Sequence, residues 1–380
     1  MRTRMTVLLT AGVALIGCGS GTAADRTTSA TDPAEATATT RSESAPTTTD
    51  EATAESRAIR APAVSTVARG LDVPWGVAFL PNGDALVAER AGRVRRIAQD
   101  GNRLSTVGTL PGVVEQGEGG LLGLAVSPTY SRDRWVYAYT TTSRDNRIVR
   151  FKLSAPRTLR TVVTGLASGA IHNGGRIAFG PDGKLYAGVG DVGDGNLSQD
   201  RGSQNGKILR MNPDGSVPKD NPIRGSRVWT LGHRNVQGLT WDGGKRLWAA
   251  ELGQNAYDEV NLIRKGKNYG WPSVEGKGTG GGKYVSPSVV WPTSEASPSA
   301  VTYLKGALWV GALRGERLWR VPLNGTKTGT PQALYVGDYG RIRTTVAAPD
   351  GSLWITTSNR DANGTRRAGD DRILRVDVKD

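Results

Sequence analysis

The stretch RIAFGPDGKLYAGVG, from Arg176 to Gly190, contains the unit from which the chain is built. Two apolar runs of strand length flank the turn sequence Pro-Asp-Gly. Glycine accepts positive φ, and Pro and Asp are favoured in tight turns, so this composition is typical of a strand, a turn and a second strand. The stretch therefore predicts a β-hairpin.

Five further copies of the hairpin recur along the chain, and their shared feature is two apolar runs around a turn. The copies are GVAFLPNGDALVAE (Gly76–Glu89), GLAVSPTYSRDRWVYAYT (Gly123–Thr140), GLTWDGGKRLWAAE (Gly238–Glu251), AVTYLKGALWVGAL (Ala300–Leu313) and TVAAPDGSLWITTS (Thr345–Ser358). After each hairpin comes an alternating apolar and polar run, such as RIVRFKL from Arg147, which is typical of a half-buried strand.

Six units of several strands each predict an all-β protein folded as a six-bladed β-propeller over residues 63–380. The 51 glycines and 10 tryptophans of the 380-residue chain agree with this class. A pair of β-sandwiches is the alternative, although it does not require a six-fold repeat. In a propeller, ligands bind at the loops that join the blades, so functional residues are expected there.

The N-terminus is typical of an exported protein. Residues 1–18 carry Arg2 and Arg4 before an apolar run that is too short to span a bilayer, and they end in LIGC at Cys18, the only cysteine. This pattern resembles a bacterial lipobox, which predicts a lipoprotein signal peptide, lipidation of Cys18 and an extracytoplasmic protein anchored to the bacterial cell membrane. An ordinary secretory signal is the alternative.

Residues 19–62 are dominated by Thr, Ala, Ser, Asp and Glu. Such a segment buries too little apolar surface to offset its ordering entropy, so we expect a disordered tether between membrane and domain. The net charge is +14, which could indicate a nucleic-acid-binding protein. The predicted export and the scattered positions of the charges argue against nucleic acid and favour a solvated basic surface with a local cationic pocket.

Four arginines lie between the repeats, in loops of different blades: Arg234, Arg314, Arg341 and Arg343. If these loops share one face, the arginines converge. A converging cationic cluster needs an anion, because unpaired charge is costly to desolvate. The alternative is that each arginine is solvated or paired locally.

The chain has two histidines, His172 and His233. His172 lies in HNGGR, where glycines permit close approach of a ligand to the backbone. Asp191 leaves the same hairpin and could return to the imidazole, which would orient the other ring nitrogen as a proton acceptor. A structural role is the alternative for His172, and it is our expectation for His233.

Several motifs, in this order, resemble the soluble aldose and glucose/sorbosone dehydrogenases, which carry pyrroloquinoline quinone (PQQ) on a six-bladed propeller. They are GEGGLLGLAVSP, HNGGRIAFGPDGKLYAGVGD, TLGHRNVQGL, DEVNLIRKGKNYGWP, WPT and GRIRTTVAAPDG, and the resemblance runs from about Leu71 to the C-terminus. It implies oxidation of aldoses at C1 to lactones by hydride transfer to PQQ, with electrons passed to an external acceptor, a quinone or a redox protein.

The resemblance also implies roles for single residues. His172 would be the general base, oriented by Asp191, and Arg234 with Asn235 would contact the quinone oxygens, where Arg234 stabilises negative charge. The remaining cofactor contacts that it implies are Glu118, Thr293, Arg314, Arg341 and Arg343. PQQ carries three carboxylates, which would explain the converging arginines.

The family further implies Ca²⁺ on PQQ, held partly by carbonyl groups at Gly253 and Gln254. Glu259 and Tyr269 match a second, structural Ca²⁺ site of some members, while a solvent-facing acid and a core tyrosine are the alternatives. Two positions depart from the glucose-oxidising members: Glu118 stands where they have Gln, and Ile171 where they have Asp. These departures favour a broad aldose dehydrogenase over a strict glucose enzyme.

Two other function classes remain possible from the sequence. A six-bladed propeller could be a Ca²⁺-dependent lactonase, which would need several Asp, Glu and Asn side chains around one axial metal, where this chain offers arginines. It could also be a non-catalytic propeller that binds carbohydrate or protein, which would leave His172 and the arginines without a joint task.

Overall fold

The computed structural model describes residues 61–101 and 103–379. The predicted signal peptide with Cys18 and positions 19–60 of the predicted tether lie outside the described residues. Two short helices occur in the described part, α1 (Tyr130–Asp133) and α2 (Asn196–Gln199), and no helix there is long and apolar enough to cross a membrane. The other elements are strands, as expected for an all-β protein.

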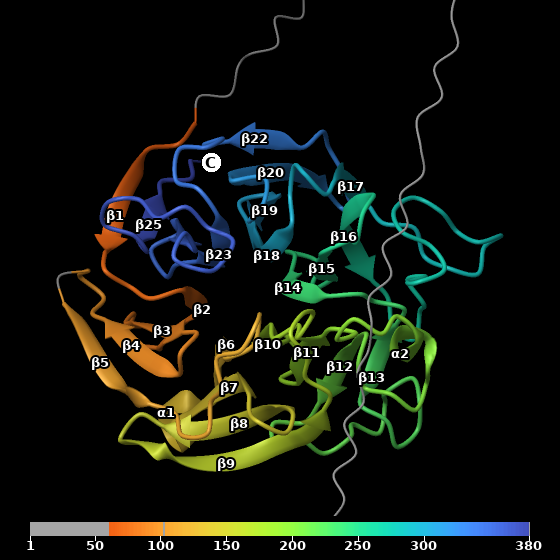
Figure 1. Ribbon diagram of the computed structural model, residues 1–380, viewed down its shortest axis with the longest axis horizontal. Coiled ribbons are helices and arrows are strands. Elements are labelled where there is room, and N and C mark those ends of the chain that lie inside the picture. Colours follow the sequence, from red (N-terminus) through yellow and green to blue (C-terminus); the bar gives the residue numbers. More distant parts are fainter. Residues whose placement is uncertain (1–60, 102, 380) are drawn as a thin grey trace, which may run out of the picture. The chain divides into compact units, whose positions relative to one another are not determined.

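Six antiparallel sheets stand around one axis, and Figure 1 views the ring along it. The sequence prediction of a six-bladed β-propeller is confirmed, and the sandwich alternative is wrong. From the axis outward, blade one is β2 (Pro74–Phe79), β3 (Ala85–Glu89), β4 (Arg93–Ile97) and β5 (Leu104–Thr109). Blade two is β6 (Leu121–Val126), β7 (Trp135–Thr141), β8 (Asn146–Lys152) and β9 (Ala155–Leu166).

Blades three and four follow the same plan. Blade three is β10 (Ile177–Phe179), β11 (Leu185–Val189), β12 (Lys207–Met211) and β13 (Val228–Leu231). Blade four is β14 (Val236–Trp241), β15 (Leu247–Glu251), β16 (Tyr257–Ile263) and β17 (Val289–Pro292).

The last two blades depart from the plan at their outer edges. Blade five is β18 (Pro298–Leu304), β19 (Ala307–Ala312) and β20 (Arg317–Asn324), with the short strands β21 (Lys327–Thr328) and β22 (Gln332–Leu334) both paired to β20. Blade six is β23 (Ile342–Ala347), β24 (Leu353–Thr357) and β25 (Ile373–Val376), and its outer strand is β1 (Val64–Ala68). Val64 pairs with Val376, so strands from the two ends of the described chain complete one sheet.

The innermost strands of neighbouring blades lie so close together that glycine is required between their backbones. A Cβ atom on Gly76 of β2 would lie 2.5 Å from the Leu122 carbonyl oxygen of β6, which is too close for any side chain. The apolar core therefore lies between the blades: Tyr137, Tyr139 and Phe179 of blades two and three, for example, belong to one cluster. Alternating strands bury these side chains because each blade uses both faces of its sheet against its neighbours.

A β-bulge interrupts the inner hairpin of five blades at the same end of the inner strand. A bulge inserts an extra residue and redirects side chains. The residues skipped by the pairing are Trp75, Leu122 with Gly123, Gln237, Ser299 and Arg343. This end of the inner strands faces the loops that carry the predicted site residues.

Antiparallel order brings these loops to one face of the ring. The loops that enter the inner strands and the loops that leave the second strands lie at the same end of each sheet. Among the predicted residues, His172 precedes β10 and Arg341 precedes β23, while Asp191 follows β11 and Arg314 follows β19. The condition for convergence, that the loops share a face, is met, and we call this the site face.

Candidate active site

A cavity of about 520 Å³ opens between the blades on the site face. Loops from all six blades contribute to it, so no single motif of the sequence builds it. The residues that line it are Arg90, Gly117, Glu118, Ala170, Ile171, Gln237, Leu252, Ser297, Leu313, Arg314, Arg341, Arg343, Asp361, Ala362 and Asn363.

Three of the four predicted arginines line this cavity. Arg341 and Arg343 are buried, and Arg314 is exposed. Arg341 Nε lies 3.4 Å from Asp361 Oδ1, and Arg343 Nη2 donates to Asp361 Oδ2 at 3.0 Å. Burial alone would raise the pKa of Asp361, but the two guanidinium groups hold it below its usual value. One carboxylate thus serves two guanidinium groups, and the pair retains positive charge.

Arg234 and Asn235 are not among the residues that line this cavity. Arg234 lies at a small neighbouring cavity, which shares Leu252 with the larger one. Its Nη1 donates to the Leu252 carbonyl at 3.1 Å. Burial lowers the pKa of Arg234, while several carboxylates, with Asp191 first, oppose this. Asn235 is fully buried, and its Oδ1 accepts from the Gly174 amide at 3.0 Å.

Three nitrogen atoms of the predicted cofactor residues are buried donors with no hydrogen-bond partner in residues 61–101 and 103–379: Arg234 Nε, Asn235 Nδ2 and Arg341 Nε. A buried donor that lacks a partner costs about 1–3 kcal/mol. Arg341 lines the large cavity and Arg234 the small one, so a ligand rich in acceptor oxygens at these neighbouring cavities would satisfy such donors. This agrees with the sequence-based expectation of an anion at the convergence of the arginines.

His172 and Asp191 meet as the sequence suggested. His172 Nδ1 donates to Asp191 Oδ1 at 2.7 Å, and the Gly193 amide donates to the same oxygen at 2.9 Å. Burial alone would raise the pKa of Asp191, but these hydrogen bonds lower it. The His172 Nε2 atom makes no hydrogen bond within the described ranges, and the side chain is 11% exposed. The ring is therefore held at one nitrogen and available at the other.

The backbone of His172 is held in an unusual conformation. Its φ is 53°, in the left-handed region that non-glycine residues rarely adopt. Its amide donates to Glu118 Oε2 at 2.9 Å. Gly190 is required opposite, since a Cβ atom there would lie 1.8 Å from the His172 carbonyl oxygen. Glu118 lines the cavity, and one of its carboxylate oxygens accepts a hydrogen bond that holds the backbone of His172.

His233 has the structural role expected from the sequence. Its side chain is fully buried, with Nδ1 2.7 Å from Glu251 Oε2 and Nε2 2.9 Å from Thr230 Oγ1. Its ring stacks on Tyr269, with centroids 4.8 Å apart. Both ring nitrogens are used, so His233 has no atom to offer to a substrate.

The predicted metal positions cluster around the loop after β15. The Gly253 amide donates to Asp258 Oδ1 at 2.9 Å and the Gln254 amide to Glu275 Oε1 at 2.6 Å, which leaves their carbonyl groups as the atoms to offer to a cation. Glu259 is buried, and burial and the charge of Glu251 raise its pKa.

The second predicted Ca²⁺ site is formed only in part. Glu259 and Tyr269 line the small cavity together with Glu251 and Glu275, so Glu259 is not a solvent-facing acid. The Tyr269 hydroxyl donates to the Leu262 carbonyl and accepts from the Arg264 amide, both at 2.8 Å, so that its side-chain oxygen is engaged. No group of three or more His, Cys, Asp or Glu with metal-site spacing occurs in the described residues.

Thr293 lies in the loop between β17 and β18 and does not line the large cavity. Its Oγ1 donates to the Asn255 carbonyl at 3.5 Å. Thr293 therefore lies beside the loop of Gly253 and Gln254.

The axis under the cavity is filled by Arg176. Its Nε donates to the Gln237 carbonyl at 2.7 Å, and its Nη2 donates to the Ser299 carbonyl and to Thr344 Oγ1, both at 3.1 Å. Its guanidinium lies 4.4 Å from the ring centroid of Trp75. Burial and the charge of Arg343 lower the pKa of Arg176 to about 9. One side chain from blade three thus touches blades one, four, five and six.

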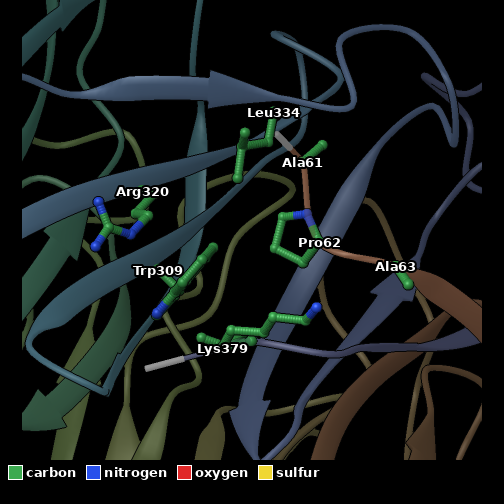
Figure 2. A pocket seen from close by; sticks show the side chains of 8 residues that line it. Ala61, Pro62, Ala63, Trp309, Arg320, Leu334 and Lys379 are labelled. Atoms are coloured by element: carbon green, nitrogen blue, oxygen red, sulfur yellow. The ribbon is translucent and has the colours of Figure 1, made fainter. Parts of the chain in front are cut away.

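A second cavity, of about 500 Å³, contains none of the predicted site residues. Figure 2 shows Trp309, Arg320, Leu334 and Lys379 around it, with Ala61–Ala63 along one side. It forms where the two ends of the described chain approach each other, at the outer part of blades five and six.

Sequence reasoning missed five residues near the large cavity: Arg90, Gln237, Trp271, Ser299 and Asp361. Gln237 and Ser299 sit at the β-bulges and could have been found by aligning the inner strands, because each precedes Gly238 or Ala300 as Trp75 precedes Gly76. Asp361 and Trp271 lie in long loops with no counterpart in other blades, so no repeat signal points to them.

The chain is similar to known proteins over the whole propeller. The model of the family described as "Glucose / Sorbosone dehydrogenase" matches residues 71–367. The solved PQQ-bound aldose sugar dehydrogenase of Streptomyces coelicolor is 51% identical, covers 83% of this chain and 99% of its own, and superposes with a TM-score of 0.79.

Two curated relatives are also similar. Aldose sugar dehydrogenase YliI of Escherichia coli (strain K12) is 30% identical over 76% of this chain and 87% of its own. Quinoprotein glucose dehydrogenase B of Acinetobacter calcoaceticus is 34% identical over 54% of this chain and 51% of its own. With the family match spanning most of the propeller, the chain belongs to the glucose/sorbosone dehydrogenase family.

Proposed function

We propose that the protein is a PQQ-dependent aldose dehydrogenase that oxidises the sugar C1 hydroxyl to the lactone. The observation that carries the proposal is the His172 ring, with Nδ1 held by Asp191 and Nε2 free, next to a cavity lined by arginines. Support also comes from the relatives, which include a PQQ-bound aldose sugar dehydrogenase and a quinoprotein glucose dehydrogenase.

The residues present fit an anionic, oxygen-rich cofactor. Arg341 and Arg343 share Asp361, so their combined charge is left positive toward the cavity. Arg314 adds a cation at the rim, and Arg234 Nε, Asn235 Nδ2 and Arg341 Nε are donors without partners. These groups would hold the carboxylates and quinone oxygens of PQQ, and Thr293 remains a proposed contact of the same cofactor.

In this function, His172 Nε2 takes the proton of the C1 hydroxyl. Asp191 keeps the proton on Nδ1, fixes the ring orientation and stabilises the imidazolium that forms. PQQ would supply the two-electron oxidising power for C1 when bound. Arg234 would stabilise negative charge that develops on it, because a buried cation acts strongly in a region from which water is excluded. The electrons leave to an external acceptor, a quinone or a redox protein.

Calcium is part of the proposal through the loop after β15. Gly253 and Gln254 would offer carbonyl oxygens to a Ca²⁺ ion shared with the cofactor, since Ca²⁺ prefers oxygen ligands. Glu259 and the Tyr269 carbonyl would contribute to a second ion in the small cavity. Burial and the charge of Glu251 raise the pKa of Glu259, so a cation bound there would favour the ionised form of this carboxyl.

We further propose that the enzyme works outside the cytoplasm, anchored through lipidated Cys18 with residues 19–62 as a tether. This proposal rests on the sequence pattern LIGC and on the composition of the segment. Metabolic labelling with a radioactive fatty acid tests it: the parent chain is expected to incorporate label, and Cys18→Ala is expected to remain unlabelled.

The function is tested by adding PQQ and Ca²⁺ to the purified full-length chain and following dye reduction with a panel of aldoses. Sugar-dependent reduction in the parent, lost in His172→Ala, supports both the cofactor and the base. Tight PQQ binding without reduction by any aldose would remove sugar from the proposal. Absence of PQQ binding would contradict the cofactor assignment and favour a lactonase or a binding propeller.

A further inference from the structure

Trp271 joins the two halves of the site that sequence reasoning treated separately. It lies in the loop after β16, in the motif YGWP. Its indole Nε1 donates to Asp191 Oδ2 at 2.8 Å. The guanidinium carbon of Arg234 lies 5.5 Å from the ring centroid of the same indole. One side chain thus contacts the partner of the histidine and the predicted charge-stabilising arginine.

The hydrogen bond from Trp271 completes the coordination of the Asp191 carboxylate. Oδ1 accepts from His172 Nδ1 and from the Gly193 amide, and Oδ2 accepts from the indole. With a donor on each oxygen, the carboxylate cannot rotate without breaking a hydrogen bond. Charge-assisted hydrogen bonds of this kind are directional, so the indole fixes the plane in which Asp191 meets the imidazole.

The ring face of Trp271 supports Arg234. Apart from its Nη1 bond to the Leu252 carbonyl, the guanidinium has a buried Nε without a partner. A cation over an indole face is stabilised, and more strongly where water is excluded. The indole therefore holds Arg234 without using its unpartnered Nε donor.

The indole is itself fixed on its other side. The Trp271 amide donates to the Gly232 carbonyl at 3.0 Å, and its carbonyl accepts from Gln199 Nε2 at 2.6 Å. Gly195 leaves the space that the loop needs, since a Cβ atom there would lie 2.9 Å from Pro272 and 3.3 Å from the indole nitrogen. Loops of blades three and four therefore lock Trp271 from several directions.

We infer that Trp271 is a positioning residue that aligns His172 through Asp191 and Arg234 through its ring face. The inference rests on the proposed function for its kinetic consequences, but the alignment of His172 is a property of the protein alone. Two substitutions separate the two actions. Trp271→Phe removes the N–H and keeps an aromatic face, whereas Trp271→Leu removes both.

The kinetic test measures kcat with a preferred aldose and the Kd for PQQ. Trp271→Phe is expected to lower kcat about 10- to 100-fold, as misplacement of a catalytic group by about 1 Å does, with the Kd for PQQ within about twofold. Trp271→Leu is expected to weaken PQQ binding by about a further fivefold, the value of one exposed cation–π contact. Equal kcat in Trp271→Phe and the parent would overturn the inference, as would equal PQQ affinity in the Phe and Leu variants.

A spectroscopic test needs no activity. Because the chain has two histidines, ring ¹⁵N signals of the cofactor-free protein resolve His172 with His233 as internal reference. The neutral His172 ring of the parent is expected to carry its proton on Nδ1, the atom that lies against Asp191. Trp271→Phe is expected to give a mixture of tautomers at His172 and no change at His233. Unchanged His172 signals in the variant would overturn the alignment claim.

A matched control is Trp135→Phe. Trp135 also lies under an arginine, with the Arg150 guanidinium 4.7 Å from its ring centroid, but it begins β7 and so lies at the end of blade two opposite the site face. This variant is expected to keep the kcat, the PQQ affinity and the His172 signals of the parent. If the parent itself reduces no dye with any aldose, the proposed function fails, while the ¹⁵N spectra still decide whether Trp271 aligns His172.

Discussion

The two histidines of the chain lie in similar pairs with opposite uses. Each has Nδ1 at 2.7 Å from a buried carboxylate, Asp191 for His172 and Glu251 for His233. The difference is at Nε2, which is free in His172 and bound to Thr230 Oγ1 in His233. A histidine–carboxylate pair alone is therefore no sign of catalysis. The free nitrogen next to a cavity is the distinguishing feature.

The backbone around the two histidines differs in the same sense. His172 has a φ of 53° and donates its amide to the Glu118 side chain, whereas the His233 amide donates to the Gly206 carbonyl at 3.2 Å. A sparsely populated conformation persists only where the surroundings enforce it, and such positions often belong to functional sites. The histidine with the unusual backbone conformation, His172, is therefore also the one whose Nε2 atom is free.

The largest difference between the two histidines is expected when each is replaced with glutamine. His172→Gln is expected to lower kcat by about 10²–10⁴-fold, the usual contribution of a general base, with little change in melting temperature. His233→Gln is expected to keep the kcat of the parent per folded molecule. Steady-state kinetics and thermal melting of both variants check this, and comparable kcat losses in the two would contradict the division of roles.

The carboxylates give the next contrast. Asp191→Asn leaves an amide at His172 Nδ1 that no longer stabilises the imidazolium, and a loss of about 10- to 100-fold in kcat is expected from the misaligned ring. Glu251→Gln is expected to leave kcat unchanged and to reduce stability. Kinetics and chemical denaturation of the pair of variants check this. An active Asp191→Asn enzyme would show that orientation by the carboxylate is dispensable.

Thr230→Val removes the hydrogen-bond partner of His233 Nε2 and so leaves this nitrogen free, as in His172, but away from the large cavity. The buried nitrogen then lacks a partner, so the free energy of unfolding should fall by about 1–3 kcal/mol. Denaturant titration measures the loss, and the kcat of the parent should be retained. A stability equal to that of the parent would mean that the hydrogen bond between Thr230 and His233 contributes nothing.

The smallest effect is expected from substitution of Glu118. Its side chain accepts a hydrogen bond from the His172 amide, whereas the His233 amide donates to a backbone carbonyl. Glu118→Gln keeps an oxygen for the amide bond but removes a negative charge from the cavity. PQQ binding should tighten about two- to fivefold, since a partly solvated charge is worth up to about 1 kcal/mol. Fluorescence titration with PQQ checks the direction, and weaker binding in the variant would contradict it.

The fold could be predicted from the sequence because its repeat is local. Each inner hairpin carries its own turn sequence and its own alternating run, and six copies leave few architectures. The outer strands were not predicted in detail, because the short strands β21 and β22 and the partner strand β1 carry no repeat pattern. Pairing of β1 with β25 depends on contacts between the chain ends, which no local signal reveals.

The site was predictable only where a motif carries chemistry. His172, Asp191 and the arginines of the cavity stand in short, unusual sequences, and the structure brings them together. Trp271 and Asp361 were missed because their importance lies in contacts with residues distant in the chain, Asp191 in another blade for Trp271 and Arg343 of the same blade for Asp361. Thr293 was assigned by resemblance alone, and its contact with the Asn255 carbonyl is not indicated by its neighbours in the sequence.

Joining β1 to β25 in one sheet has a consequence for how the chain folds. Five blades can assemble from segments that are continuous in sequence, but blade six needs strands from both ends, and closing so long a loop is entropically costly and slow. Before β1 pairs with β25, the edges of both strands are unpaired and can pair with strands of other chains. We therefore expect β1 to pair with β25 late in folding, and a circular permutant that opens a different blade should move that step around the ring.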